Sequence, residues 1–597
     1  MTAYAAPMND MLFAMRELAG LEAIADLPGN EEVSTDLAEA ILDEAGKFAA
    51  EVLAPINASG DRQGCTCKDG VVTTAAGFRE AYAAFCDNGW HAMPVGAEFG
   101  GQGLPTVISA AVKEMCESAN MAFSLCPTLT IGAVEAIARH GSEALKQRFL
   151  PQMVEGKWTG TMNLTEPQAG SDLAAVRTKA VPDGDAYRIR GTKIFITWGE
   201  HDMTENIVHL VLARLPDAPE GVKGISLYLV PKYLVNDDGS LGARNDLVCA
   251  SIEHKMGIHA SSTAVMAFGE KEGAIGYLVG VPNRGLACMF TMMNHARLNV
   301  GIQGVGISER AYQQALAYAR ERVQGRPIGE PGEEARPIVH HPDVRRMLMD
   351  MKARIEAMRA LAYYTSGIMD IAHGHPDASL RSRSQAVVDL LTPVVKGWCT
   401  ESALAITSTG IQVHGGVGFI EETGASQYLR DARITTIYEG TTGIQANDLI
   451  GRKLARENGT TMRALMEEMT AEATDLSAVG DADLTLIGAA LNRALAVLTS
   501  ATRWMLDNCE ANPRAAAAGA VPYLKLAGTV AGGWLMARAA RVAARKLAAG
   551  EGDAGFLRAK LITARYYSEH VLPEAQTYGD AIVHGAASVL ALEAALF

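Results

Sequence analysis

The sequence lacks the features that mark metal-binding, disulfide-stapled or nucleic-acid-binding proteins. Nine cysteines are scattered through 597 residues, and the one close pair, Cys65 and Cys67, has no second pair at metal-ligand spacing. The formal net charge of −15 is unfavourable for contacts with a phosphate backbone. We therefore expect no metal site, no nucleic-acid partner and a reducing compartment.

Targeting and membrane segments are also lacking. The first residues, MTAYAAPMNDMLFAMRELAG, do not place a basic region before an apolar core, as a signal peptide does. Apolar runs such as LAGTVAGGWLMA fall short of the roughly 20 residues that a membrane span needs. We expect a cytoplasmic protein.

No strand is followed by the G-x-G-x-x-G pattern of a dinucleotide-binding fold. The glycines of GIQGVGIS and HGGVGF do not have that spacing. A nucleotide bound by this chain must therefore be held in another way.

Successive regions of the chain have distinct hydrophobic periodicities. Residues 36–160 repeat apolar residues at helical spacing, residues 161–285 alternate short β-rich runs with turn signals, and residues 286–458 return to long helices. Residues 1–35 form an amino-terminal extension, and residues 459–597 add a further helical block. The segment GRPIGEPGEEARPIVHHP, rich in Pro, Gly and acidic residues, predicts a loop. These patterns indicate a compact β-domain inserted between helical domains, with an antiparallel bundle after it.

Two stretches of the β-rich region carry candidate binding groups. MNLTEPQAGSD, residues 162–172, places small hydroxyls and exposed amides around a proline turn, where they can bind a ring edge or phosphate oxygens. An ordinary solvated turn capped by Ser171 and Asp172 is the alternative. KIFIT, residues 193–197, places Phe195 and Thr197 on one face of a strand, although such a pair is more often sheet core.

A third stretch, TTIYEGTTGIQ, holds one carboxylate, Glu439, in a nearly chargeless setting. A buried carboxylate is costly unless it is paired, protonated or used in catalysis. The alternative is structural: Thr441 and Thr442 can cap the helix GIQANDLIGRKLARE and leave the acid at its positive end.

Taken together, TEPQAGSD, IYEGTTGIQ and the order of the domains resemble the acyl-CoA dehydrogenase family of flavoproteins, over about residues 40–455. The resemblance implies an α+β, mainly α fold with an amino-terminal helical domain, a central β-barrel-like domain and a carboxy-terminal four-helix bundle. It also implies FAD, bound in an extended form without a Rossmann fold, which accounts for the missing glycine pattern.

The resemblance assigns site residues by position. Met162, Leu164 and Thr165 match the pyrimidine side of the flavin, Gly170 and Ser171 the phosphate loop, and Phe195 and Thr197 the region near N5. A second group matches contacts to the adenine and diphosphate half, often across a dimer interface: Arg322, Gln324, Gln412, Gly415, Gly416 and Thr441.

Glu439 matches the catalytic base of the family, which removes the α-proton of an acyl-CoA thioester. Ser171, Tyr438 and Gly440 are the expected substrate contacts, and Gly440 leaves room for the thioester against the backbone. Some relatives place the base on the early helix of the bundle or in the loop before it, but the segment matched to that place here, IHASSTAVM, contains no carboxylate. In that segment Ala264 stands where many members have an arginine near CoA, which weakens any assignment of CoA contacts.

The amino-terminal Tyr4–Phe13 stretch and the block beyond residue 459 resemble a long branch of the family with a carboxy-terminal helical extension, which includes 3-methylmercaptopropionyl-CoA dehydrogenases and long bacterial fatty-acyl-CoA dehydrogenases. Two interpretations of the extension stay open: a packing domain that covers the bundle and strengthens a dimer, or a membrane-associating surface around ARAARVAARKLAAG.

The expected function is oxidation of an acyl-CoA to trans-2-enoyl-CoA, with electron-transfer flavoprotein as the electron acceptor and a homodimer as the assembly. An acyl-CoA oxidase that uses O2 is one alternative. A DNA-associated flavoprotein relative is another, for which Arg538, Arg541, Arg545 and Lys546 would supply a basic cluster.

Overall fold

The computed structural model describes residues 3–329 and 334–597, so residues 330–333 of the predicted loop lie outside the described residues. The chain divides into two compact units. The first, here called the bundle unit, comprises Met1–Gly46, Pro105–Ser118 and Leu298–Phe597. The second, the β unit, comprises Lys47–Leu104 and Ala119–Arg297.

The β unit is built around an eight-stranded sheet. Its path runs β10-β11-β5-β12-β7-β6-β3, and β4 pairs with both β5 and β6, which closes part of the sheet into a ring. Strands β6 and β7 are buried almost along their whole length, as expected for strands covered on both faces. The strands are β3 (Trp158–Asn163), β4 (Lys179–Asp183), β5 (Ala186–Thr197), β6 (Asn206–Arg214), β7 (Ile225–Pro231), β10 (Leu247–Ile252), β11 (Thr263–Phe268) and β12 (Ala274–Val279).

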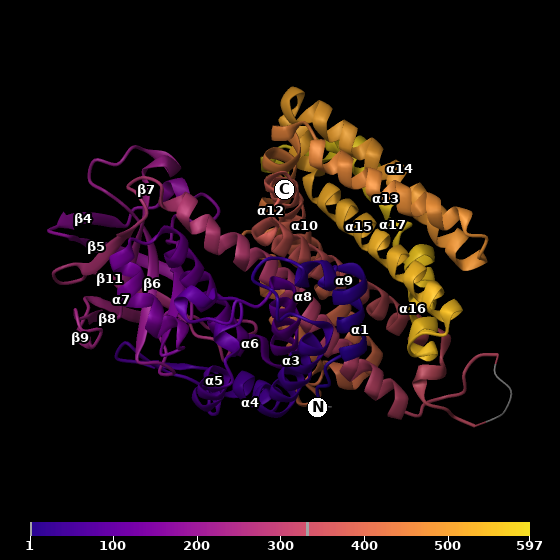
Figure 1. Ribbon diagram of the computed structural model, residues 1–597, viewed down its shortest axis with the longest axis horizontal. Helices are drawn as coiled ribbons and strands as arrows, with labels where there is room; N and C mark the ends of the chain where they lie inside the picture. Colours follow the sequence, from indigo (N-terminus) through magenta and orange to yellow (C-terminus); the bar gives the residue numbers. More distant parts are fainter. Residues whose placement is uncertain (1–2, 330–333) are drawn as a thin grey trace. The chain divides into compact units, whose positions relative to one another are not determined.

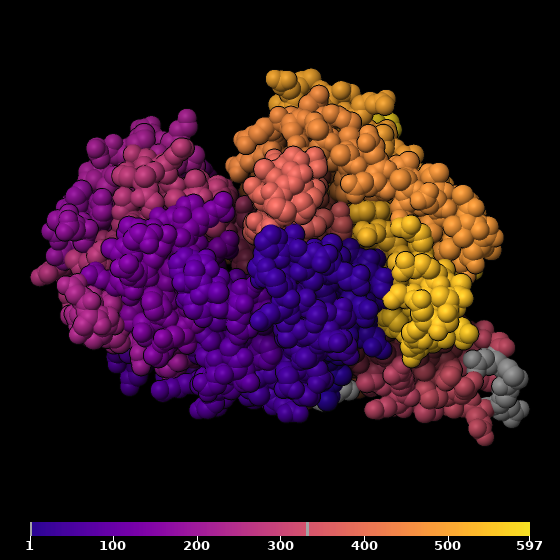
Figure 2. Space-filling model, viewed as in Figure 1, coloured from indigo at the N-terminus to yellow at the C-terminus, as the bar shows by residue number. Residues whose placement is uncertain are grey.

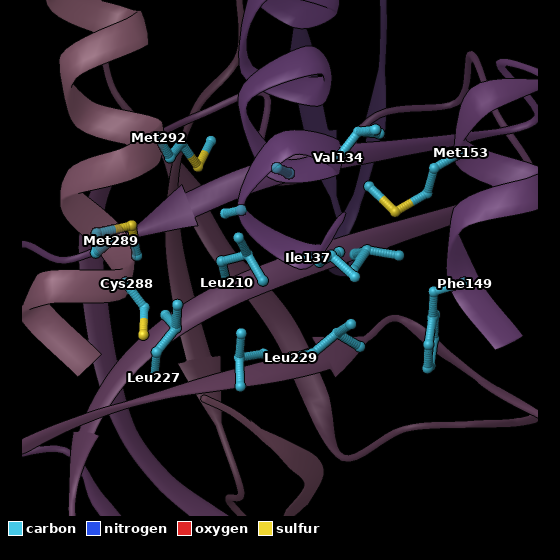
Figure 3. Packing of buried hydrophobic residues seen from close by; sticks show 14 of the residues in the cluster. Val134, Ile137, Phe149, Met153, Leu210, Leu227, Leu229, Cys288, Met289 and Met292 are labelled. Atoms are coloured by element: carbon cyan, nitrogen blue, oxygen red, sulfur yellow. The ribbon is translucent and has the colours of Figure 1, made fainter. Parts of the chain in front are cut away.

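Aliphatic and sulfur-containing side chains fill the space between this sheet and the helices of the β unit. Figure 3 shows Leu210, Leu227 and Leu229 of the sheet meeting Val134 and Ile137 of α6 (Thr106–His140). Methionines and Phe149 complete the cluster. Burial of this apolar surface is the main source of the unit's stability. The other helices of the unit are α4 (Ala54–Gln63), α5 (Phe78–Asp87) and α7 (Glu143–Val154).

The region predicted as helical between residues 36 and 160 also contains a short hairpin. Strands β1 (Thr66–Lys68) and β2 (Val71–Thr73) pair across Asp69 and Gly70, both at positive φ. The helical periodicity of the flanking segments hid these two three-residue strands. A further short pair, β8 (Tyr233–Val235) and β9 (Leu241–Arg244), lies within the predicted β-rich region.

Among the described residues, helix α6 (Thr106–His140) is one of two helices that are long and apolar enough to cross a membrane, although the sequence analysis found no such run. In α6, 89% of the most apolar window is buried inside the protein, as in the core helix of a globular domain. The other is α14 (Ala482–Ala511), whose window is half buried. The backbone of α6 breaks at Asn120, with φ −158° and ψ 89°.

The bundle unit contains the long helices predicted after residue 286. These are α8 (Gly285–Glu321), which enters the unit at Leu298, α9 (Pro342–Gly374) and α10 (Ala378–His414). A buried ion-pair network joins them to α6, because Arg359 of α9 contacts Glu114 of α6 and Glu309 of α8. The unit also contains α3 (Thr35–Phe48) and two short helices, α11 (Ala425–Ala432) and α12 (Thr442–Asp448).

The carboxy-terminal extension packs on this bundle. A Cβ placed at Gly528 of α15 (Pro513–Ala549) would lie 2.2 Å from Cγ of Trp398 on α10, so the two helices are in close contact. Helices α13 (Thr460–Ala478) and α14 lie alongside α15 (Figure 1). The extension also contains the α-helices α16 (Ala554–Tyr566), α17 (Glu574–His584) and α18 (Ala586–Ala591).

The amino-terminal segment is anchored to the extension within the same unit. It contains α1 (Met8–Phe13) and α2 (Leu21–Ala25). Figure 2 shows this indigo segment against the yellow end of the chain. Phe13 packs edge-on against Phe556 at 5.8 Å, and Lys560 pairs with Asp10. The two parts that distinguish the long branch therefore pack together.

The basic cluster of α15 is engaged inside the unit. Arg541 pairs with Glu472 at 2.7 Å, Lys546 pairs with Glu17, and Arg538 lies over the ring of Trp534. The apolar face of the same stretch, including Ala540 and Ala543, is buried. This geometry favours the packing interpretation of the extension over a membrane or DNA surface.

Candidate active site

Glu439 lies in a tight loop of the bundle unit, immediately before α12. Its backbone has φ +54°, and Gly440 follows with φ +90°. A left-handed conformation is uncommon for a residue with a side chain and persists only where the surroundings enforce it. The predicted cap is correct for Thr441, whose hydroxyl accepts from the Ile444 amide at 3.3 Å, but not for Thr442, whose hydroxyl donates to Glu401. The cap and the strained acid are therefore present together.

Two buried side chains fix the carbonyl groups of this loop. The Gln445 amide donates from Nε2 to the carbonyl oxygens of Glu439 at 3.0 Å and of Gly440 at 3.3 Å. The Lys396 ammonium donates to the Gly440 carbonyl at 2.7 Å. Both side chains belong to fully buried residues. The sequence analysis assigned neither role, although Gln445 is the last residue of the quoted motif.

Tyr438, the residue before Glu439, is held through its side chain. The Tyr438 hydroxyl donates to Oε1 of Gln303 on α8, and the Gln303 amide donates to Oε1 of Glu117 on α6 at 3.1 Å. Burial raises the pKa of the Glu117 carboxyl to about 8, against the hydrogen bond from Gln303 and the charge of Lys113. The role of Tyr438 in substrate binding stays a prediction, and the structure adds this internal contact.

In the β unit, the TEPQAGSD loop is anchored by a buried acid. Glu166 pairs with Lys193 of β5 at 2.8 Å and accepts from the amides of Arg177 and Thr178. Burial acts to raise the pKa of the Glu166 carboxyl, but the Lys193 charge and the hydrogen bonds lower it to about 2. Glu166 is thus an anchor of the loop, a role that the sequence analysis did not assign.

This anchoring leaves the expected flavin contacts of the loop accessible. Met162 on β3 and the following Leu164 and Thr165 are half-buried, while Gly170 and Ser171 are exposed. Asp172 accepts from the Ala174 amide at 3.0 Å, so the predicted capping of the turn is correct for this residue. The exposed amides and hydroxyls of residues 170–171 are the type of group that binds ring edges or phosphates.

Phe195 is presented by a β-bulge in β5. The pairing with β11 passes from Ala264↔Ile196 to Met266↔Lys193, so β5 contains one extra residue. Phe195 has φ +60° and is 59% exposed, whereas the next residue, Ile196, is buried. Bulges re-aim side chains next to functional sites. The bulge leaves an aromatic face exposed two residues before the half-buried Thr197.

Five of the six residues matched to the nucleotide half of FAD are exposed in the bundle unit, and the sixth, Thr441, is half-buried. Arg322 and Gln324 follow α8 in a loop closed by hydrogen bonds from Gln324 to Arg336 and from Ile338 to Arg322. Gln412 is exposed in the last turn of α10, which ends at Gly415 with φ +63°. Among the described residues, no atom lies within 4 Å of a Cβ built at Gly415 or Gly416. A guanidinium and open backbone suit a diphosphate.

Comparison with known proteins identifies the family. Four domain models match successive parts of the chain: acyl-CoA dehydrogenase N-terminal domain (35–157), middle domain (161–270) and C-terminal domain (283–455), and acetyl-CoA dehydrogenase C-terminal like (464–593). The chain belongs to the acyl-CoA dehydrogenase family. The predicted family, fold class and enzyme class are confirmed.

Individual relatives cover nearly the whole chain. The chain is 49% identical to a 3-methylmercaptopropionyl-CoA dehydrogenase of Ruegeria pomeroyi, with 96% of each protein covered. It is 37% identical to a butyryl-CoA dehydrogenase of Syntrophomonas wolfei, with 96% of this chain and 95% of the relative covered. The fold is similar to that of an acyl-CoA dehydrogenase from Bacillus anthracis complexed with FAD (TM-score 0.74, 21% identity, covering 94% of this chain and 90% of that one).

Proposed function

We propose that the chain catalyses FAD-dependent α,β-dehydrogenation of an acyl-CoA thioester to trans-2-enoyl-CoA, with Glu439 as the general base. One observation carries this proposal. Glu439, the residue that matches the family's base, has a strained backbone. Gln445 and Lys396 hold that backbone by donating to the carbonyls of Glu439 and Gly440. Strain maintained by buried anchors is typical of functional positions.

The roles of the chain's own residues follow from this loop. Glu439 accepts the α-proton, which ends on its carboxyl group. The Glu439 backbone N–H donates to the thioester carbonyl oxygen and stabilises the enolate-like charge that develops there. Gly440 presents no side chain beside the thioester, and a Cβ at this position would lie 2.6 Å from Nε2 of Gln445, so a larger residue would displace the amide that holds the loop.

The donor groups on both units fit FAD, which when bound supplies the acceptor for the β-hydride at N5. On the β unit, the exposed Phe195 offers an aromatic face and Thr197 a hydroxyl. Met162 and Leu164 add apolar side chains, Thr165 and Ser171 add hydroxyls, and Gly170 adds an exposed backbone. On the bundle unit, Arg322, Gln324, Gln412, Gly415 and Gly416 suit the diphosphate and adenine half. The Thr441 hydroxyl accepts as a cap and keeps its proton for donation.

The relatives support two substrate classes, a 3-methylmercaptopropionyl-CoA and a straight-chain acyl-CoA. The family supports electron-transfer flavoprotein as the acceptor. Exposed apolar side chains directly after Gly416, at Val417, Phe419 (84% exposed) and Ile420, support a homodimer, because monomers rarely expose such a cluster. We place the enzyme in the cytoplasm.

The test is anaerobic bleaching of the visible flavin band by a panel of acyl-CoAs that includes 3-methylmercaptopropionyl-CoA, butyryl-CoA and palmitoyl-CoA. Rapid bleaching by one class supports the dehydrogenation and identifies the substrate. Purified protein that carries flavin but is bleached by no acyl-CoA contradicts the proposal. Peroxide release during turnover in air would identify an oxidase instead of a dehydrogenase.

A further inference from the structure

A continuous chain of polar contacts runs from α6 to the loop of Glu439, entirely within the bundle unit. Glu117 of α6 accepts from Gln303 of α8, and Gln303 in turn accepts from the hydroxyl of Tyr438. Glu117 and Gln303 are 2% and 1% exposed, so water competes little for these bonds. A hydrogen bond of this kind is expensive to leave unmade once its partners are buried.

The acidic residues around Tyr438 place this series of hydrogen bonds near the proposed base. Burial and the charges of Glu117, Glu439 and Asp431 all raise the pKa of the Tyr438 hydroxyl, so the Glu117 and Glu439 carboxyl groups lie near the same phenol. The other groups that face Glu117 are Lys113 and Cys116 of its own helix. Because burial raises the pKa of Glu117 to about 8, this acid carries a proton at neutral pH and adds no charge to the surroundings of the base.

We propose that Glu117 is a positioning residue for the Glu439 base, acting through Gln303 and Tyr438. The inference rests on the proposed function of Glu439. The carbonyls on the carboxy-terminal side of the base are held by Gln445 and Lys396, and the Glu117–Gln303–Tyr438 chain holds its amino-terminal side. Together these contacts fix the left-handed backbone of Glu439 from both directions.

Because Glu117 loses its proton at alkaline pH, the rate of flavin reduction should depend on pH. Above pH 8 the Glu117 carboxyl ionises and adds its negative charge to those of Glu439 and Asp431 near Tyr438. The transition state develops negative charge at the thioester oxygen, so an added negative charge nearby disfavours it. The rate of flavin reduction should therefore decline with an apparent pKa near 8, and a neutral isostere at position 117 should remove that decline.

The experiment measures single-turnover flavin reduction by the acyl-CoA that bleaches the holoenzyme, at pH values on both sides of 8. Glu117→Gln should reduce flavin at the wild-type rate at neutral pH and lack the alkaline decline. Glu117→Leu should reduce it about tenfold more slowly, with unchanged FAD content and substrate Kd, and Tyr438→Phe should slow it to a similar extent with unchanged FAD content. Glu472→Gln, a buried acid of α13 in the extension, is the matched control and should keep the wild-type profile.

An alkaline decline that persists in Glu117→Gln, or a wild-type rate in Glu117→Leu, would overturn the inference. If Glu117→Leu does not fold, the pH profile of Glu117→Gln still decides. Glu439→Gln distinguishes failure of the Glu117 positioning role from failure of the proposed base. Loss of reduction in that variant beside a wild-type rate in Glu117→Leu removes only the role of Glu117, whereas normal reduction by Glu439→Gln removes the base and its positioning together.

Discussion

The side-chain amide of Gln445 lies 3.0 Å from the carbonyl oxygen of Glu439 and donates to it from within the protein. This contact means that the proposed base is held in place through its backbone. The same amide reaches the next carbonyl, that of Gly440, at 3.3 Å. A single buried residue therefore fixes the peptide geometry on which both the base and the backbone N–H depend.

Replacement of Gln445 tests this arrangement. Gln445→Met keeps the volume but removes the donor, so we expect flavin reduction to slow about tenfold and stability to fall by about 1–2 kcal/mol. The rate is measured by anaerobic stopped-flow bleaching and the stability by thermal unfolding. Gln385→Met, in which an exposed amide of α10 loses its bond to Asp389, is the control and should change neither. Equal rates in the two variants would show that the Gln445 contact does not position the base.

Gly440 is constrained by both conformation and space. Gly440→Ala adds a Cβ at φ +90° and 2.6 Å from Nε2 of Gln445, so we expect a loss of about 1–2 kcal/mol and a marked drop in reduction rate. Gly443→Ala, in α12, meets only Thr441 Oγ1 at 3.8 Å and should leave the rate unchanged. Melting temperature and bleaching rate are measured for both. A fully active Gly440→Ala would contradict the proposed approach of the thioester to this backbone.

Much of the fold follows from periodicity. The long helices α8, α9 and α10 and the strands of the β unit lie where apolar spacing predicts them, because burial of one face dictates that spacing. The hairpin β1–β2 escaped prediction since three-residue strands are too short to show an alternation. The predicted helix after Thr441 also changes form, as α12 ends at Asp448 and a wider π-helical turn follows over Leu449–Leu454.

The site was predictable only where a motif is contiguous. Glu439, Gly440 and Thr441 stand together in the sequence, and so do Thr165 to Ser171. Gln303, Lys396 and Glu117 are more than 30 residues from the motif they support and have no distinguishing local pattern. Their roles arise from the packing of α6, α8 and α10, which single-sequence periodicity does not specify.

We expect the stability of the β unit to depend on the ion pair between Lys193 and Glu166, which anchors the TEPQAGSD loop. Lys193→Met leaves the buried Glu166 carboxylate without its cation, which should cost about 3 kcal/mol of unfolding free energy. Arg188→Met, on the same strand, removes a more exposed pair with Asp183 and should cost about 1 kcal/mol or less. Chemical denaturation compares the two. Equal losses would show that the buried pair is not an anchor.

The same pair has a pH signature with a defined sign. The pKa of Glu166 is lowered from 4.5 to about 2, so its contribution to stability is fully present above pH 4.5 and is lost as the pH falls toward 2. Wild-type protein should show this acid-dependent loss, and Lys193→Met should show less of it.

Arg322 is the cationic residue proposed for the FAD diphosphate. Arg322→Ala should weaken FAD binding about tenfold, because a charge-assisted hydrogen bond to phosphate is lost. The measurement is a fluorescence titration of the apoprotein with FAD. Arg320→Ala, which removes an exposed cation from the last turn of α8, should bind FAD as the wild type does. Equal affinities of the two variants would remove Arg322 from the proposed site.

The central claim is that Glu439 removes the α-proton, and a single variant tests it most directly. Purified Glu439→Gln is mixed anaerobically with the acyl-CoA that bleaches the wild-type flavin, and the visible band is followed. The account predicts that the variant retains FAD and binds the acyl-CoA, yet its flavin stays oxidised because the amide cannot accept the proton. Flavin reduction at a rate near that of the wild type would contradict the account.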